Sequence, residues 1–129
     1  MNKKEYIQKL ETLQLDKKRY CIISGGVMLL YGLKDTTEDI DIKIKPDYFE
    51  ELKTRFHFTK SSKYPYLYEL EDKCEVAVLD YKKSDIRIVD SYPVESLELQ
   101  LKWMIENNRK KDQEKIKLIK DFLKKTKEK

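Results

Sequence analysis

Two groups of residues in the N-terminal third of the chain have types and spacing that suit phosphate and metal chemistry. Ser24, Gly25 and Gly26 stand between two apolar runs. Small residues at the start of a helix let a phosphate approach unpaired backbone N–H groups closely. Asp39 and Asp41 follow after residues 27–38, and two carboxylates at this spacing suit a divalent cation. The two groups together predict a polyphosphate held beside a metal ion.

The two aspartates are predicted to share one face of a strand. Residues 39–45 alternate strictly between charged residues and isoleucines. Because the isoleucines must face a core, the acids face the opposite side. Two plainer interpretations remain open: Ser24–Gly26 as a tight strand-to-helix turn, and Asp39 and Asp41 as solvated acids on an exposed sheet face. The combination of both groups at this separation favours a functional site.

Hydrophobic periodicity predicts the elements that position these residues. Apolar stripes at helical spacing predict helices over residues 2–14, 27–33, 47–56 and 94–107, with a last helix beginning at Asp112. Short apolar runs predict strands over residues 20–23, 39–45, 64–69, 74–81 and 86–89, and an extended piece over 58–60. Asp47 with Glu50 predicts a capping box at the start of the third helix. The pattern indicates a mixed α+β fold.

Composition narrows the classes of protein. At 129 residues we expect one domain, 1–129, with a heavily charged surface of 28 Lys and Arg against 24 Asp and Glu. No apolar run approaches the roughly 20 residues of a membrane span, and the N-terminus lacks the core of a signal peptide. Cys21 and Cys74 lie in apolar runs, which predicts buried reduced thiols and a cytoplasmic protein. Two cysteines and one histidine argue against zinc. A weaker alternative is a nucleic-acid-binding module using the lysines and tyrosines.

The motif resembles the signature of a known superfamily. Ser24-Gly25-Gly26, a twelve-residue spacer (27–38) and Asp39-Ile40-Asp41-Ile42 are similar to the signature of polymerase-beta-type nucleotidyltransferases. Among its branches the chain looks most like the minimal, AbiEii-like bacterial proteins of toxin–antitoxin systems. The resemblance covers residues 20–45 well and the rest more loosely. It implies an α+β nucleotidyltransferase fold, a small mixed β-sheet with helices mainly on one face, plus two C-terminal helices.

The resemblance also implies a reaction and its participants. A nucleoside monophosphate would pass from an NTP to an acceptor hydroxyl with the help of Mg²⁺ or Mn²⁺. The acceptor classes left open are tRNA, protein and small molecules, and a homodimer or a toxin–antitoxin partner is a possible assembly. By family position, Ser24, Gly25 and Gly26 bind the phosphates, and Asp39 and Asp41 bind the metal. The alternative is a catalytically degenerate protein of the same fold, acting as a nucleotide-binding or protein-interaction module.

The family places a third acid on a neighbouring strand, where it completes the metal site and assists deprotonation of the attacking hydroxyl. The candidates are Glu75 and Asp80. Strand parity favours Glu75, since the residues on either side of it are apolar, as they are around Asp39 and Asp41. Asp80 has the parity of the apolar face and lies near the strand end. We predict Glu75 as the third acid, with Asp80 as the alternative.

Later residues resemble further family positions. Lys102 corresponds to a lysine that steadies the triphosphate, and Lys111-Asp112 corresponds to a functional Lys-Asp pair. Each has a plainer interpretation: Lys102 as a solvated lysine, and Asp112 as a helix N-cap.

Overall fold

The structure is a computed structural model that describes residues 1–71 and 73–127. The chain divides into two compact units, Met1–Glu95 and Ser96–Lys129. The single domain expected from the length therefore stays a prediction.

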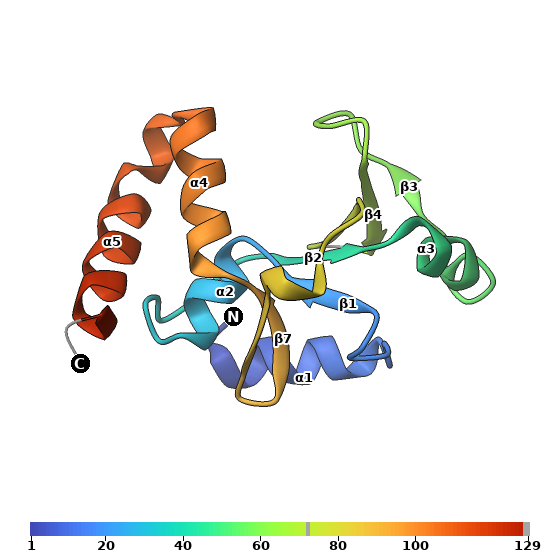
Figure 1. Cartoon of the computed structure of the whole chain (residues 1–129). Coiled ribbons are helices and arrows are strands. Elements are labelled where there is room, and N and C mark those ends of the chain that lie inside the picture. The colour runs from blue at the N-terminus through green and yellow to red at the C-terminus, as the bar shows by residue number, and fades with distance from the viewer. Residues whose placement is uncertain (72, 128–129) are drawn as a thin grey trace. The chain divides into compact units, whose positions relative to one another are not determined.

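A mixed sheet forms the centre of the first unit (Figure 1). In the described residues the strand order is β3-β4-β5-β2-β1-β7-β6. β2 pairs parallel with β5 and β1 pairs parallel with β7, whereas the other neighbours are antiparallel. The strands are β1 Tyr20–Ile22, β2 Ile40–Ile44, β3 Thr59–Lys60, β4 Leu67–Glu71, β5 Cys74–Val78, β6 Ile86–Val89 and β7 Tyr92–Glu95.

The helices of the first unit are short, and the first and third of them pack on the face of the sheet that carries the isoleucines of β2. They are α1 Lys3–Thr12, α2 Gly25–Leu30 and α3 Pro46–Leu52, with a 3₁₀ turn, η1, at Lys83–Asp85. Asn2 caps α1 through a capping box with Glu5. The capping box predicted for α3 is wrong, because α3 begins at Pro46 with Lys45 at the N-cap. Proline is favoured at the first helical position, where its missing N–H costs nothing.

The core lies on the isoleucine side of β2, as the alternation predicted. Ile40, Ile42 and Ile44 are at most 1% exposed. Their partners on β5 are Cys74, Val76 and Val78, so one apolar face runs across both strands. From α1, Tyr6 reaches this face next to Ile22, and from α3, Phe49 packs on Tyr68 with ring centroids 4.6 Å apart.

Both cysteines lie inside the first unit as free thiols. Cys21 and Cys74 are at most 1% exposed. Burial raises the pKa of each thiol to about 12. A raised pKa makes the nucleophilic thiolate scarce at neutral pH, so these two cysteines contribute to packing.

One strand escaped the sequence prediction. β7 pairs with β1 and β6, although the helical stripe was expected to begin at residue 94. Asp90 and Ser91 have φ values of 52° and 68°, which makes the β6–β7 connection a two-residue hairpin turn. The strand is four residues long and contains Pro93, so its sequence pattern is weak. The rest of the predicted stripe forms α4, Leu97–Asn107.

The second unit is a helical hairpin with a short 3₁₀ turn. It contains α4, η2 Lys110–Asp112 and α5 Gln113–Lys127. Leu97, Met104 and Ile119 are buried, whereas Ile105, predicted to face inward, is 50% exposed. Asp112 is fully buried and accepts a hydrogen bond from Nε of Arg109 at 2.7 Å.

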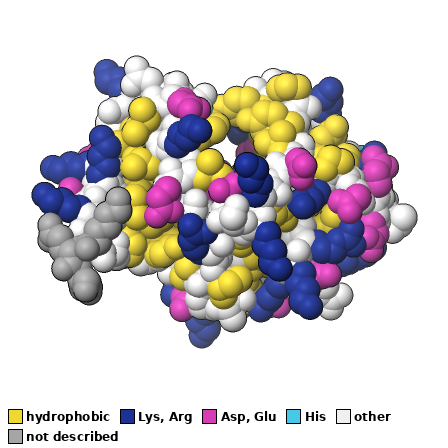
Figure 2. Space-filling view, in the orientation of Figure 1, with side chains coloured by type: hydrophobic (Ala, Val, Ile, Leu, Met, Phe, Trp, Pro, Cys, Tyr) yellow, Lys and Arg dark blue, Asp and Glu magenta, His cyan; other side chains and the backbone are white. Residues whose placement is uncertain are grey.

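The surface mixes both signs of charge. Lysine and arginine side chains alternate with aspartate and glutamate over the face drawn in Figure 2. No helix in the described part of the chain is both long and apolar enough to cross a membrane.

Candidate functional site

Three acids from adjacent strands form a row across the sheet. Asp41 on β2 is in register with Glu75 on β5, and Glu75 is in register with Glu69 on β4. Residues in register on neighbouring strands project from the same face about 4.8 Å apart. The row lies on the face opposite the isoleucines. Sequence reasoning predicted Asp41 and Glu75 but missed Glu69, which belongs to no motif and differs from the other exposed acids by its register alone.

Backbone hydrogen bonds fix the position of Asp41 and the start of β2. The amide of Ile23 donates to the carbonyl oxygen of Asp41 at 3.0 Å, and the amide of Ile40 donates to Lys73 at 2.7 Å. β2 is therefore bonded on both sides where the acids lie. Asp39 precedes the first residue of β2, two positions before Asp41. The sheet thus holds the backbone of Asp41, and a fixed backbone is a condition for a preorganised site.

Asp80, the alternative third acid, lies away from the row. It stands five positions beyond Glu75, which corresponds to about 16 Å along an extended strand. Its side chain is 86% exposed and lies 3.8 Å from Nζ of Lys45. Asp80 therefore belongs to the opposite end of β2, and the structure brings Glu75, not Asp80, next to Asp41.

The Ser-Gly-Gly turn lies at the same end of the sheet as the acids. β1 runs antiparallel to β2 with Ile22 opposite Ile42, so the residues after β1 lie beside the beginning of β2. Ser24 has φ 60° and ψ −137°, and α2 begins at Gly25. In the part of the chain that the structure describes, the Ser24 side chain makes no capping hydrogen bond. The turn and the acid row thus lie at the same end of the sheet.

Steric contacts explain both glycines. A Cβ on Gly26 would lie 2.3 Å from the Tyr6 hydroxyl oxygen and 2.7 Å from Cγ2 of Ile22, and both neighbours are fully buried. A Cβ on Gly25 would lie 2.6 Å from Oγ1 of Thr37. Side chains at these positions would displace packed atoms. The same region holds a cation that sequence reasoning missed, since Nζ of Lys34 lies 3.8 Å from the Cβ position of Gly25.

A second missed cation contacts the acid row. Nζ of Lys63, in the β3–β4 connection, lies 3.2 Å from Oε1 of Glu75. The hydrogen bond with Glu75 raises the pKa of Lys63, and the charges of Asp39 and Asp41 raise it further. The ammonium group is therefore within electrostatic reach of all three predicted metal ligands. No motif marks this lysine, because the β3–β4 connection that places it has no sequence signature.

A buried ion pair lies farther along the same face. Nζ of Lys43 and Oε2 of Glu95 are 2.5 Å apart, with side chains 15% and 9% exposed. The pair joins β2 to β7 across Cys21, which is in register with Lys43. A charge pair at this burial is costly to break, because removing one partner strands the other.

The carboxylates offer the type of ligand that a hard cation prefers, although they do not enclose a common position. Asp39, Asp41 and Glu75 offer oxygen ligands, which Mg²⁺ and Mn²⁺ prefer. Among the described residues no three acids, cysteines or histidines stand close enough together to hold an ion. The ammonium group on Glu75 occupies part of the space that ligation requires.

The remaining predicted residues lie in the second unit. Lys102 is exposed on α4. Lys111 and Asp112 lie in η2, where the buried Asp112 side chain pairs with Arg109 and lies 3.7 Å from Lys115. This pairing gives Asp112 a structural role inside its own unit. A contribution of Lys102 to a triphosphate site stays a prediction.

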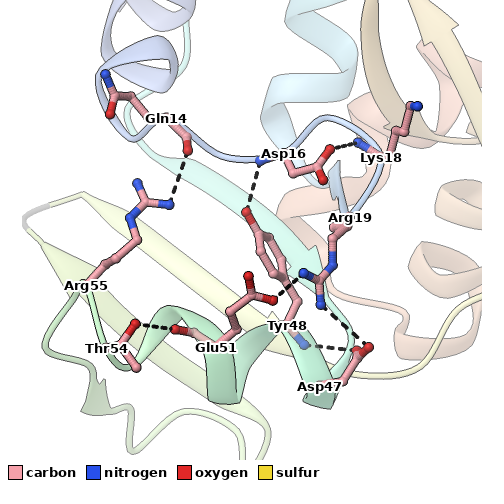
Figure 3. A network of polar contacts seen from close by, with 9 residues as sticks. All are labelled: Gln14, Asp16, Lys18, Arg19, Asp47, Tyr48, Glu51, Thr54 and Arg55. Carbon is pink, nitrogen blue, oxygen red and sulfur yellow. Dashed lines mark hydrogen bonds and ion pairs between the residues drawn. The ribbon is translucent and has the colours of Figure 1, made fainter.

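The first unit also contains a polar cluster on α3 and the loop after α1, which we call the arginine network (Figure 3). Arg19 pairs with Glu51 and lies 3.6 Å from Asp47, while Arg55 donates to the carbonyl oxygens of Leu13 and Gln14. The Tyr48 hydroxyl accepts from the amide of Asp16 at 2.9 Å. Residues of the network line a pocket of about 360 Å³. Figure 3 labels its members: Gln14, Asp16, Lys18, Arg19, Asp47, Tyr48, Glu51, Thr54 and Arg55.

Comparison with known proteins gives one likeness at the level of fold. No protein-family model and no curated protein matches the chain. A solved structure that does match is that of an aminoglycoside nucleotidyltransferase. It is ANT(2″)-Ia in complex with adenylyl-2″-tobramycin, with a TM-score of 0.52 and 14% sequence identity, over 92% of this chain and 85% of that chain. At this identity the likeness concerns the fold alone.

Proposed function

We propose that this protein is a metal-dependent nucleotidyltransferase that moves a nucleoside monophosphate from an NTP to an acceptor hydroxyl. The observation that carries the proposal is the register of Asp41 with Glu75, at the end of the sheet where the Ser-Gly-Gly turn also lies. A phosphate-binding turn beside carboxylates is the arrangement that phosphoryl chemistry needs. The fold likeness to a nucleotidyltransferase supports the same assignment.

Each residue of the site has a role in this proposal. Ser24 and the amides of Gly25 and Gly26 hold the triphosphate, and Asp39, Asp41 and Glu75 hold Mg²⁺ or Mn²⁺. The metal, when bound, neutralises charge on the phosphates. Glu75 accepts the proton of the acceptor hydroxyl. The hydroxyl oxygen then forms a bond to the α-phosphorus of the NTP, and the bond between that phosphorus and pyrophosphate breaks. Lys102 is proposed to steady the triphosphate.

The acceptor and the biological setting belong to the proposal as classes to be tested. The ANT(2″)-Ia structure contains an adenylylated aminoglycoside, which makes hydroxyl-bearing small molecules one class. Transfer RNA and protein hydroxyls are the other two. The AbiEii-like resemblance of the motif supports a toxin–antitoxin partner, and a homodimer is an alternative assembly.

Label transfer is the direct test. The protein is incubated with each α-labelled NTP, Mg²⁺ and cell extract, and the labelled product is assigned to RNA, protein or small molecules. We expect transfer that disappears with EDTA and in Asp39→Ala. Absence of NTP binding by calorimetry in the presence of Mg²⁺, together with no effect of Asp39→Ala, would overturn the proposal.

A second candidate is a catalytically degenerate nucleotidyltransferase-fold protein that binds a nucleotide or a protein partner. The observation in its favour is the absence of a closed three-ligand cage among the described residues. A glutamate at the third position, where the family more often has aspartate, points the same way. Nucleotide binding without label transfer to any acceptor class would favour this candidate.

A further inference from the structure

The β3–β4 connection delivers one ammonium group to the acid row. Lys63 contacts Glu75 at 3.2 Å, and its side chain is 63% exposed whereas that of Glu75 is 16% exposed. The contact thus joins a mostly solvated cation to a mostly buried carboxylate. A divalent cation bound by Glu75 would need the same oxygen atoms.

The backbone around Lys63 forms a closed turn. The amide of Ser61 donates to the carbonyl oxygen of Leu67 at 2.9 Å, and the amide of Leu67 donates to Tyr64 at 3.2 Å. The amide of Lys63 itself donates to Oγ of Ser61 at 3.2 Å. Tyr64 and Tyr66 stack with centroids 5.4 Å apart. These hydrogen bonds hold the backbone from which the Lys63 side chain extends towards Glu75.

We propose that Lys63 is a built-in counter-ion that occupies Glu75 in the metal-free protein and competes with the divalent cation for that carboxylate. This inference rests on the proposed metal site of Asp39, Asp41 and Glu75. An ammonium group offsets part of the repulsion among carboxylates, and an ion pair whose ammonium group is mostly solvated is weak enough for a dication to displace. Metal binding then releases the Lys63 side chain from the site.

The competition predicts the sign of a mutational effect. Removing the ammonium group abolishes both the competitor and its repulsion of the incoming dication, so Lys63→Met should bind Mn²⁺ more tightly. We expect the dissociation constant to fall about three- to ten-fold. Lys63→Arg keeps the charge and should stay close to the wild-type protein.

Mn²⁺ titration of the full chain, followed by calorimetry and by the electron paramagnetic resonance of free Mn²⁺, tests this inference. The matched control is Lys60→Met, because Lys60 is in register with Tyr68 on the other face of the sheet and should leave the affinity unchanged. Thermal melts verify that each variant is folded. The inference is supported if Lys63→Met alone gains affinity.

Two results would overturn it, and they are distinguishable. Equal or weaker Mn²⁺ binding by Lys63→Met, with the wild-type protein binding the ion and Asp41→Asn losing it, refutes the counter-ion and leaves the metal site standing. No Mn²⁺ binding by the wild-type protein refutes the metal site itself and the counter-ion with it.

Discussion

The two ends of β2 carry clusters of charged residues that differ in how their charges are partnered. At the end where the strand begins, Asp41, Glu75 and Glu69 line up across three strands, with Lys63 as an identified cation partner. Beyond the other end, the arginine network joins its members by local hydrogen bonds and ion pairs. Like charges directly opposite each other on neighbouring strands are destabilising, and proteins commonly retain such a cost where function needs it. The hydrogen bonds of the arginine network instead connect α3 and the residues after it to the loop after α1. The difference points to function at the first end and to structure at the second.

The sharpest test of this contrast removes one charge from the acid row. Asp41→Asn should lower label transfer by about 10³-fold, about 4 kcal/mol in transition-state stabilisation, because it removes a metal ligand. Urea unfolding of the same variant verifies that it is folded. Full activity in this variant, or a marked loss of stability, would assign the acid row to the scaffold.

The packing beneath the Ser-Gly-Gly turn is the next test. Gly26→Ala should lower the free energy of unfolding by about 2–3 kcal/mol, because the new methyl group meets the Tyr6 hydroxyl and Ile22. The Tyr6 hydroxyl is buried, and no hydrogen-bond partner for it exists among the described residues. Tyr6→Phe should therefore be neutral or stabilising and should rescue part of the loss in the double variant. Additive effects of the two substitutions would argue against this contact.

Alkaline pH probes the apolar face behind the acid row. Burial raises the pKa of Cys74 to about 12, above the value of an unfolded thiol. The contribution of the protonated Cys74 thiol to the free energy of unfolding is fully present below about pH 9. It is lost as pH rises towards 12, at about 1.4 kcal/mol per pH unit. Urea unfolding between about pH 8 and 11 should show a shallower decline for Cys74→Ala than for the wild-type protein. Equal slopes would mean that water reaches this thiol in the folded state.

The arginine network should give the smallest effect. Arg55→Met removes hydrogen bonds to Leu13 and Gln14 at the end of α1 and should lower the free energy of unfolding by about 1 kcal/mol. Label transfer should be unchanged. Lys18→Met, which leaves both Arg55 bonds in place, serves as the matched control. Reduced transfer in Arg55→Met at normal stability would extend the functional site to this end of the molecule.

Local patterns predicted the parts of the site that lie on regular strands. The isoleucine alternation placed Asp41 on the solvent side of β2, and parity placed Glu75 on the same side of β5. Asp80 was harder to exclude, because the end of a strand and its register with β2 depend on pairing that no local pattern encodes. Glu69 and Lys63 were missed for the same reason.

The missed strand illustrates a different limit. β7 contains Pro93 and follows a turn whose Asp90-Ser91 sequence is weaker than the Asn-Gly or Asp-Gly pairs that mark such hairpins. Its stability comes from β1 and β6 on either side, a tertiary contribution that propensity does not contain. Its last residue, Glu95, forms the buried ion pair with Lys43. Because the strand was not predicted, this ion pair was not predicted either.

The parallel pairing of β2 with β5 has a consequence for how the chain folds. Asp41 and Glu75 meet only after the whole segment between them, α3 with the β3–β4 hairpin, has crossed back over the sheet. Pairing over such a separation incurs its loop-closure entropy before its contacts form, so we expect it among the late steps of folding. The same crossover carries Lys63. We therefore expect Glu75 and Lys63 to reach the two aspartates in the same step of folding.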